Sequence, residues 1–556
     1  MIRWACTVVV FAWLIAGCSK GSSSPGAAPG PGSFKLVSKT LNGIPPGTPQ
    51  YNINASPVTR FTFSAPVDHN SVTNSFYFKD NAGVAIPYTA SYENRDSAIV
   101  IQPASALKPI TKYGLGFSAF LQSQDKVSLQ SSIDIQFTTA IDSTDKFPRL
   151  TDSALLTLVQ QQTFKYFRDL GGPVSGLARE RASGDVVTTG GSGFGIMAIL
   201  VGIQRNFITR TDALTRIMTM VNFLGDSTKV TRYHGAFSHW LNGTTGATVP
   251  FSALDNGGDI VETSYLMQGL LCARQYFNSP TDPGEIDLRI AINKLWSGVD
   301  WNWYRQGGQN ILYWNWSPDH NWAVNVPVKG WNEALITYVL AASAPMDSIP
   351  KTTYDSGWAL NGGMANGNSF YGVRLPLGPG QGGPLFFAHY SFLGIDPHGL
   401  SDAYANYWTQ DTAHARINYL YCANNPGHFN GYSSLCWGLT ASDEQNGYSA
   451  HSPANDDGVI TPTAAISSLP YTPTESMNAL RFFYYKLGDK IWGQYGFTDA
   501  FNLTNIWFDS DFLAIDQGPE IVMIENYRSG LLWNLFMSCP EIKSGMKKLG
   551  FQSPNL

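Results

Sequence analysis

The chain has 556 residues, a net charge of −5 and only 14% charged residues. This length predicts two or three domains, and the weak charge excludes a polyanionic partner such as nucleic acid. Aromatic residues make up 13% of the chain, with 16 Trp and 26 Tyr. They indicate either surfaces that stack on sugar rings or the aromatic core of a large enzyme, and composition alone does not separate the two.

The first residues are typical of an exported protein. Met1-Ile2-Arg3 precedes an apolar run from Thr7 to Ile15 that is too short to span a bilayer, and small residues then lead to Cys18. Ile15-Ala16-Gly17-Cys18 resembles the lipobox of bacterial lipoproteins. We therefore expect residues 1–17 to be a signal peptide and Cys18 to carry lipid as the only membrane contact; an ordinary signal peptide is the alternative.

Residues 18–33 continue from this cysteine as a stretch of Gly, Ser, Pro and Ala, which buries too little apolar surface to fold. We expect a flexible tether between the lipid and the first domain. Lys20 is not the aspartate that retains enterobacterial lipoproteins at the inner membrane. The expected location is the cell envelope, at the outer membrane, on its periplasmic or surface face.

Residues 34–141 consist of short alternating segments separated by turn residues, which predicts a small antiparallel β-sandwich. The predicted strands are 59–63, 75–78, 98–101, 113–117 and 133–137. The blocks 63–68, 107–113 and 137–139 resemble bacterial Ig-like domains. Such a module is expected to be a spacer or packing partner, with carbohydrate binding as the alternative.

From residue 150 to the C-terminus the apolar period becomes helical. Predicted helices begin at 151 and continue at 193–206, 211–224, 259–277, 285–297, 332–343, 401–420, 475–487 and 529–538. Long Gly, Asn, Pro and Trp-rich segments join them, and loops of this length in a compact domain are usually functional. We expect a helical toroid with a cleft built from loops at one end.

Four cysteines remain in this region: Cys272, Cys422, Cys436 and Cys539. They form no C-x-x-C pair of the kind used for zinc or redox chemistry, so we expect neither a metal nor a cofactor. An oxidising envelope would permit a disulfide between Cys422 and Cys436.

The densest group of acids is Asp255, Asp259 and Glu262, around the Gly257-Gly258 turn. Asp259 and Glu262 are three residues apart and share one side of a first helical turn. Glycoside hydrolysis requires two carboxyl groups with different roles, and crowding of like charges raises at least one pKa. Glu262 is the candidate proton donor. The alternative is a capping box, in which Asp259 and Glu262 only satisfy backbone N–H groups.

A further acid, Glu333, follows Trp331 at the predicted start of another helix. The helix dipole favours a charged Glu333 unless burial opposes it, so this residue suits a base or an acceptor for a sugar hydroxyl. The alternative is a first-turn acid that only stabilises its helix.

Downstream segments add stacking and hydrogen-bonding groups that could bind a substrate. These candidate substrate-binding residues, together with Trp331, are Trp437, Asp443, His451, Asp516, Gln517, Tyr527 and Arg528. A structural salt bridge between Glu525 and Arg528 is the alternative explanation for the last of them.

Several blocks of this region together resemble the glucoamylase-like domain of bacterial lipoproteins and, more narrowly, glycoside hydrolase family 144, the endo-β-1,2-glucanases. The blocks are 257–263, 330–335, 437–443, 462–465, 514–519 and 523–531. The resemblance covers about Leu150 to the C-terminus. It implies an (α/α)6 barrel and inverting hydrolysis of β-1,2-glucan to sophorose and short sophoro-oligosaccharides.

The family residues that matter for activity match Asp255, Asp259, Glu262 and Glu333. Residues 342–347 depart from the family, where relatives more often have Ser-Pro-Thr-His. Two alternatives remain: hydrolysis of another glucan on the same barrel, and non-hydrolytic capture of glycans by a lipoprotein. A monomer is expected.

Overall fold

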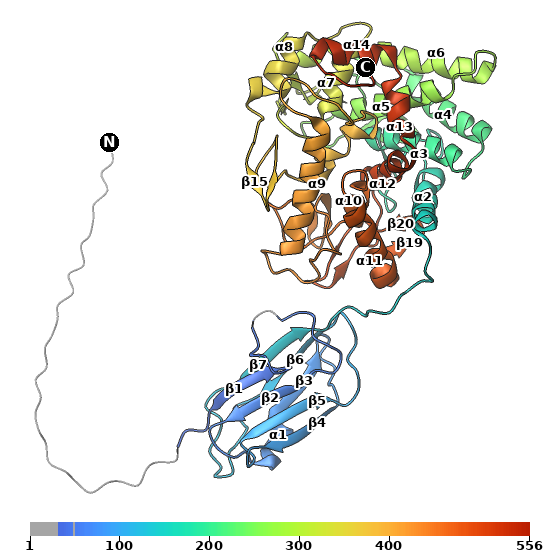
Figure 1. Ribbon diagram of the computed structural model, residues 1–556. Coiled ribbons are helices and arrows are strands. Elements are labelled where there is room, and N and C mark those ends of the chain that lie inside the picture. Colours follow the sequence, from blue (N-terminus) through green and yellow to red (C-terminus); the bar gives the residue numbers. More distant parts are fainter. Residues whose placement is uncertain (1–31, 48–49) are drawn as a thin grey trace, which may run out of the picture. The chain divides into compact units, whose positions relative to one another are not determined.

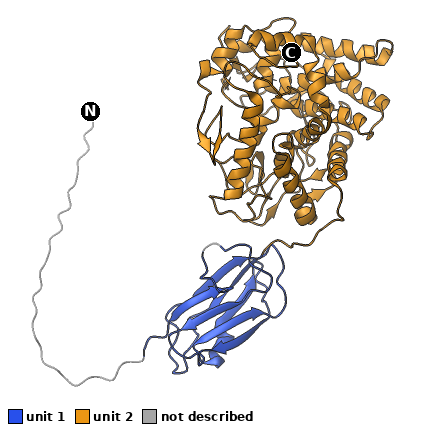
Figure 2. Cartoon of the chain, viewed as in Figure 1, with its two compact units in different colours: residues 1–139 blue, residues 140–556 orange. Residues whose placement is uncertain are grey.

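The computed structural model describes residues 32–47 and 50–556, so the expected signal peptide, Cys18 and nearly all of the tether lie outside the described residues. The chain divides into two compact units, residues 1–139 and residues 140–556 (Figures 1 and 2). Each unit has its own core and is described by itself.

The N-terminal unit consists of two antiparallel sheets, so the predicted Ig-like sandwich is confirmed. The first sheet has the order β1 (Leu36–Leu41), β2 (Thr59–Phe63), β5 (Ala98–Pro103), β4 (Tyr88–Glu93), and the second has the order β3 (Phe76–Asp80), β6 (Lys112–Phe117), β7 (Ile133–Thr138). A short helix, α1 (His69–Ser75), precedes β3. Phe61, Phe63 and Phe117 pack edge to face between the sheets, which is the favoured geometry for aromatic pairs. The sequence missed β1 and β4.

The C-terminal unit is helical, and its helices fall into two classes by burial. The helices that are buried around most of their circumference are α3 (Thr189–Gln204), α5 (Ile260–Tyr276), α7 (Leu335–Ser343), α10 (Pro462–Ser467) and α12 (Ala514–Ser529). The helices with an exposed face are α2 (Asp152–Asp169), α4 (Arg210–Gly225), α6 (Pro283–Ser297), α9 (Tyr407–Asn424), α11 (Pro473–Ile491), α13 (Leu531–Met537) and α14 (Pro540–Leu549). A helix that is apolar all round belongs inside a large core.

Short turns and hairpins connect these helices. The short helical turns are η1 (Trp303–Arg305), α8 (Lys351–Thr353), η2 (Tyr354–Trp358), η3 (Leu360–Gly362), η4 (Leu385–Ala388) and η5 (Ser391–Leu393). The paired strands are β8 (Val186–Thr188), β9 (Trp240–Asn242), β10 (Thr248–Val249), β11 (Gly258–Asp259), β12 (Leu312–Tyr313), β13 (Asn315–Trp316), β14 (Pro327–Val328), β15 (Ser369–Phe370), β16 (Val373–Arg374), β17 (Ala441–Glu444), β18 (Gly447–Ala450), β19 (Trp492–Gly493), β20 (Gly496–Phe497), β21 (Phe501–Asn502) and β22 (Trp507–Phe508).

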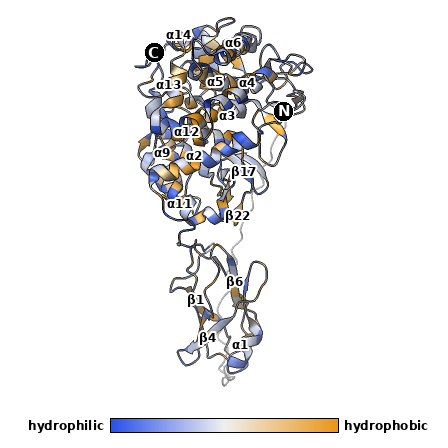
Figure 3. Cartoon of the chain, turned by 90° about the vertical axis from the view of Figure 1, so that its right-hand side faces the viewer, coloured by the Kyte–Doolittle hydropathy of each residue, from blue (hydrophilic) through white to orange (hydrophobic). Residues whose placement is uncertain are grey.

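The buried helices pack against one another in a continuous series. Helix α3 contacts α5 and α12, α5 contacts α7, α7 contacts η5, and α12 contacts both η5 and α10. Hydrophobic residues accordingly gather in the middle of this unit (Figure 3). Glycine permits the closest approach, because a Cβ on Gly193 of α3 would lie 2.1 Å from the carbonyl oxygen of Tyr265 on α5.

Most predicted helices are present with shifted ends, but α10, α12 and α14 were missed. The segment Gly518-Pro519 looks like a turn in the sequence, since proline removes a backbone donor and glycine favours irregular structure. In the structure both residues lie inside α12. A Cβ on Gly518 would come within 2.4 Å of the Phe194 side chain, so this glycine allows α12 to lie against α3.

The possible disulfide between Cys422 and Cys436 is not formed. Both residues, like Cys272 and Cys539, are buried free thiols. No described helix is long and apolar enough to cross a membrane.

The segment that leads into the helical unit packs firmly on α11. Phe147 stacks on Tyr484 with ring centroids 4.6 Å apart, and Arg149 lies over the ring of Tyr485. The backbone N–H groups of Lys146 and Leu150 donate to the carbonyl and hydroxyl oxygens of Tyr485, each at 2.8 Å. Residues 146–150 therefore belong to the helical unit.

We predict that a fragment starting at residue 140 folds alone and is more stable than one starting at Thr151. Two hydrogen bonds at about 1 kcal/mol each and an aromatic pair at about 1 kcal/mol give a difference of about 3 kcal/mol in unfolding free energy. Urea unfolding of both fragments measures it. Equal midpoints would show that residues 146–150 contribute nothing to stability.

Candidate active site

The N-terminal ends of the buried helices lie together at one end of the helical unit. Thr188, which precedes α3, places its hydroxyl 3.4 Å from Glu262 in the first turn of α5. A Cβ on Gly191 of α3 would lie 2.8 Å from Ala514, the first residue of α12. Ser391 accepts a hydrogen bond from the N–H of Ile336 at the start of α7 and donates one to the carbonyl oxygen of Glu333.

Asp259 is the N-cap of α5, as half of the capping-box alternative requires. Its carboxylate accepts hydrogen bonds from the N–H groups of Val261 and Glu262 at 3.0 and 2.9 Å. The other half of the alternative is wrong, because the N–H of Asp259 donates to Phe237 and not to Glu262. The Glu262 carboxylate instead accepts the N–H of Gly190 at 2.7 Å, in a space that a Cβ on Gly190 would fill.

Burial governs the charge of these acids. Burial raises the pKa of Glu262, and Asp259 adds to the shift while His239 opposes it, so the prediction of a raised pKa at Glu262 is confirmed. Burial and the nearby Asp259 charge raise the pKa of Asp255 to about 6. The side-chain amide of Asn315 donates to Asp255 at 2.8 Å.

His239 is the cation at the centre of this group. Its Nδ1 lies 3.0 Å from Asp259 Oδ2, and its Nε2 lies 4.0 Å from Glu262 Oε1. Burial opposes its charge, but Glu262 and Asp259 outweigh burial and raise its pKa to about 9. Trp314 donates its indole N–H to the same Asp259 oxygen at 3.2 Å.

The Gly257-Gly258 turn serves protein packing. A Cβ on Gly257 would lie 2.1 Å from the carbonyl oxygen of Trp316, and one on Gly258 would lie 2.1 Å from the hydroxyl of Tyr304. Gly257 therefore allows β11 to pair closely with β13, and Gly258 makes room for the side chain of Tyr304.

Glu333 lies two residues before α7, not in its first turn as the sequence predicted. Burial raises its pKa to about 7, and the charges of Glu262 and Asp259 contribute. Among the described residues, the group that favours the charged form of Glu333 is the backbone N–H of Glu333 itself. The sequence predicted an ionised Glu333 unless burial opposed it, and burial does oppose the charge and outweighs the helix dipole.

A second group of acids contains Asp443, Asp499 and Asp516. Arg181 contacts both oxygens of Asp443, at 2.9 and 3.4 Å, and the N–H of Asp443 donates to Asp499 at 2.7 Å. Burial raises the pKa of Asp499 far above its usual range and that of Asp516 to about 7. The hydrogen bond between these two acids favours a protonated Asp499 that donates to Asp516. A cavity of about 10 Å³, the size of one water molecule, borders Asp516.

Three buried aromatic residues, packed in tilted and edge-to-face contacts, connect the two acidic groups. The rings of Phe194, Tyr265 and Tyr390 lie 5.2 to 5.6 Å from one another. Tyr390 is close enough to both Asp516 and Glu333 for each charge to raise its pKa, while Tyr265 responds to Glu333 and Glu262. The two acidic groups therefore lie on either side of one buried aromatic cluster.

Several predicted substrate-binding residues lie in the packing core. Trp331 is 4% exposed and stacks between Phe392 and Tyr407, and Trp437 is fully buried against Tyr419. Neither indole offers a free face to a sugar ring. Gln517 is also fully buried and donates to the carbonyl oxygen of Phe497 at 2.9 Å.

Tyr527 and Arg528 lie at the far end of α12. Eleven residues separate Asp516 from Tyr527, which corresponds to about 16 Å along a helix. Arg528 donates to Gln160 and Thr157 on α2, at 2.7 and 3.0 Å. Both residues are therefore remote from the acidic groups, which contradicts their assignment as substrate-binding residues.

The salt bridge expected between Glu525 and Arg528 as the structural alternative is not formed. Glu525 pairs with Arg205 through two hydrogen bonds, at 2.6 and 2.7 Å, and not with Arg528.

His451 is buried in a separate cluster with Glu444 and Asp457.

His239, Arg181 and Asp499 are the residues of this site that sequence reasoning missed. His239 and Asp499 are isolated in the sequence and reach the acids only through tertiary packing. The charged run Arg179-Glu180-Arg181 was a visible signal, because adjacent charges that become buried in a fold require partners.

Comparison with known proteins relates both units to known families. Residues 325–540 match the family model described as "Putative glucoamylase", and residues 39–139 match the bacterial Ig-like domain model. The endo-β-1,2-glucanase structure from Chitinophaga pinensis is 51% identical, covering 73% of this chain and all of that chain, with a TM-score of 0.71. A β-1,2-glucanase structure from Parabacteroides distasonis is 39% identical, covering 93% of this chain and 73% of that chain, with a TM-score of 0.70.

The curated relative is an exo β-1,2-glucooligosaccharide sophorohydrolase (non-reducing end) of Parabacteroides distasonis, 48% identical over 423 residues. The match covers 72% of this chain and spans 58% of the length of that relative. The chain therefore belongs to the glucoamylase-like family, together with the Chitinophaga pinensis and Parabacteroides distasonis proteins.

Proposed function

We propose that this protein is a glycoside hydrolase that cleaves β-1,2-glucan, with inversion, to sophorose and short sophoro-oligosaccharides. The observation that carries the proposal is 51% identity across the whole chain of an endo-β-1,2-glucanase. The two acidic groups on either side of Tyr390 supply the chemistry that such an enzyme needs.

The proposed fold of the catalytic unit is an (α/α)6 barrel. Buried and exposed helices alternate along the chain from α2 to α12, and the buried elements form a ring in which α12 returns to α3. The substrate would bind at the end where the buried helices begin, next to the two acidic groups.

Glu333 is the proposed proton donor. A general acid must hold its proton near neutral pH, and Glu333 does so because burial raises its pKa to about 7. Glu262 is a weaker candidate, since the N–H of Gly190 and the nearby His239 cation both favour its charged form. Its proposed role is to accept hydrogen bonds from sugar hydroxyls with Asp255 and Asp259.

The second acidic group supplies the proposed base. Asp516 accepts the hydrogen bond of Asp499 and borders a space for one water molecule. Its pKa of about 7 suits an acid that is ionised in part of the molecules at neutral pH and can accept a proton from water. Arg181 fixes Asp443 beside this pair.

The identity to a sophorohydrolase favours a second candidate, exo cleavage that releases sophorose from the non-reducing end. A time course on long β-1,2-glucan separates the two modes, because endo cleavage yields oligosaccharides of many lengths from the start. Sophorose as the sole early product would favour exo cleavage. Retention on the polymer without any product would instead indicate a glycan-capture protein, and products only from another glucan would contradict the proposed linkage.

Replacing Glu333 with Gln should lower turnover by roughly 10²–10⁴-fold, the usual contribution of a general acid. The melting temperature should not change, since the carboxyl group accepts its hydrogen bond from its own backbone. Initial rates on β-1,2-glucan measure the effect. Unchanged turnover would show that Glu333 is not the proton donor.

The pH dependence of kcat/KM should be bell-shaped with a maximum near pH 7. Turnover falls above pH 7 as Glu333 loses its proton, and it falls below pH 7 as Asp516 gains one, because each pKa is about 7. The alkaline limb should be absent from Glu333→Gln. An alkaline limb that persists in this variant belongs to another group.

Asp259→Ala and Glu262→Gln should separate stability from catalysis within the first acidic group. Asp259→Ala removes the N-cap of α5 and should lower the unfolding free energy by about 1–2 kcal/mol. Glu262→Gln keeps an oxygen for the N–H of Gly190 and should reduce turnover while the fold melts nearly unchanged. Intact turnover with a lowered melting temperature in Glu262→Gln would make Glu262 a purely structural residue.

We also propose that lipid on Cys18 anchors the protein in the cell envelope, which the Ile15-Ala16-Gly17-Cys18 motif supports. Cys18→Ala should release or mislocalise the protein without reducing turnover, because the acidic groups all lie after residue 150. Fractionation of membranes and mass measurement test this. A Cys18→Ala protein that remains lipidated in the membrane would contradict it.

A further inference from the structure

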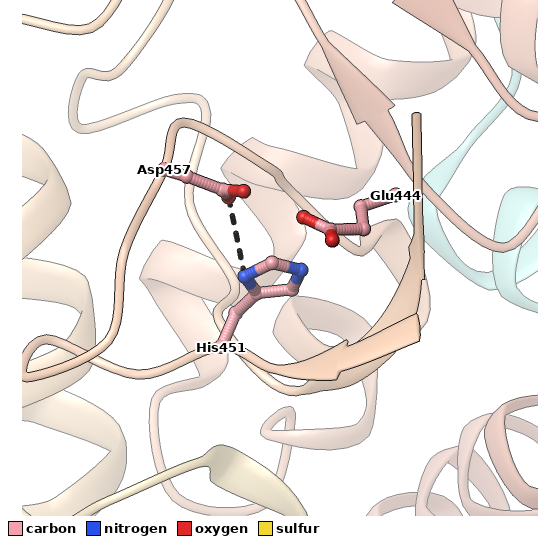
Figure 4. Close-up of side chains that lie close together, drawn as sticks. All are labelled: Glu444, His451 and Asp457. Atoms are coloured by element: carbon pink, nitrogen blue, oxygen red, sulfur yellow. Dashed lines mark ion pairs between the residues drawn. The ribbon is translucent and has the colours of Figure 1, made fainter. Parts of the chain in front are cut away.

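A cluster of three potential metal ligands lies outside the acidic groups described above. Glu444, His451 and Asp457 each offer a ligand atom, and these atoms all lie within 4.8 Å of one another. Figure 4 shows the two carboxylates on either side of the His451 ring. Glu444 ends β17, His451 directly follows β18, and Asp457 comes from the loop that leads to α10.

His451 points into this cluster with an unsatisfied nitrogen. The residue is 2% exposed, and its Nε2 has no hydrogen-bond partner among the described residues. Figure 4 shows this nitrogen on the side of the Glu444 carboxylate. A buried polar atom without a partner is costly, so a group that is not part of the chain is expected to satisfy it.

The two carboxylates are likewise short of positive charge. Among the described residues, neither Glu444 nor Asp457 forms an ion pair with a lysine or arginine. The two carboxyl groups lie close enough to form a hydrogen bond with each other, and Asp457 also contacts His451. The distance from His451 Nδ1 to Asp457 Oδ1 is 3.3 Å. This contact engages Nδ1, so Nε2 is the nitrogen of His451 that is left to bind an ion.

The backbone holds the three residues in place. The N–H of His451 donates to the carbonyl oxygen of Thr440, and Ser452 and Asn455 exchange backbone hydrogen bonds in the turn that returns the chain toward His451. The side chain of Asn502 donates to the carbonyl oxygen of Asp457 at 3.0 Å. A site with fixed ligands loses less conformational entropy when it binds an ion.

We propose that Glu444, His451 and Asp457 form a binding site for a divalent transition-metal ion, for which zinc is the best probe. The imidazole favours a transition-metal ion such as zinc, which also accepts carboxylate oxygens and water as ligands. The ion would join the β17–β18 hairpin to the 452–461 loop. Because Asp443 is the residue before Glu444, the ion would also stabilise the hairpin that carries Asp443.

Zinc titration of the full chain tests the proposal, using protein purified without an affinity tag and treated with EDTA. Calorimetry should give one zinc ion per chain, and zinc should raise the melting temperature until EDTA is added. Glu444→Gln and Asp457→Asn remove a ligand charge from partly exposed positions and should each weaken zinc binding at least tenfold. Both variants should melt like the metal-free wild-type protein.

Asp509→Asn is the matched control, because Asp509 lies with Asp443 and Asp499 in the other group of described residues that could hold an ion. Its zinc affinity should equal that of the wild-type protein. A wild-type protein that binds no zinc would overturn the proposal. So would zinc affinity that survives in Glu444→Gln and Asp457→Asn, or that is lost in Asp509→Asn.

Discussion

The burial of carboxyl groups with too few cations is the constraint on which the candidate site depends. Asp255, Glu262, Glu333 and Asp516 all have raised pKa values, and burial is the largest cause for each. Such burial destabilises the charged forms, so the acids either keep a proton or obtain hydrogen bonds from backbone N–H groups. At a single pH the site can therefore contain both protonated and ionised carboxyl groups. This allows one carboxyl group to donate a proton while another accepts one.

The helix dipoles act against burial, and the position of each acid decides how strongly they do so. Glu262 lies inside the first turn of α5 and receives the N–H of Gly190 from the start of α3. Glu333 lies two residues before α7, where no helix N–H reaches its carboxyl group among the described hydrogen bonds. The dipole effect falls off within the first turn. Burial therefore raises the pKa of both glutamates, but more groups favour the charged form at Glu262 than at Glu333.

The sequence predicted those parts of the fold and site that depend on local pattern. Strands of the Ig-like sandwich, most helices and the joint location of Asp259 and Glu262 follow from periodicity and from spacing within one helical turn. Residues that act across the fold were not predictable in this way. Arg181 and Asp443 are 262 positions apart, and only the packing of β17 brings them together. Trp437 was misassigned as a substrate-binding residue because the sequence does not reveal whether the faces of an indole ring are buried.

Helix α12 shows how a local rule conceals a functional element. Gly518 and Pro519 each predict an irregular segment, yet here the glycine permits contact with Phe194 and the helix extends through both. Asp516 precedes them by a few residues, so its place beside Asp499 could not be recognised without the helix.

The β17–β18 hairpin joins the two groups of potential ligands in this unit. Successive residues of a strand point to opposite faces, so Asp443 faces Arg181 while Glu444 faces His451. A shift of one residue in the hairpin register would exchange these faces and place Glu444 among the buried acids. The register is held by the paired residues Asp443 and Tyr448 and by the hydrogen bond from His451 to Thr440 just outside the hairpin. The contacts of His451 on one side of the strand therefore help to keep Asp443 in position on the other.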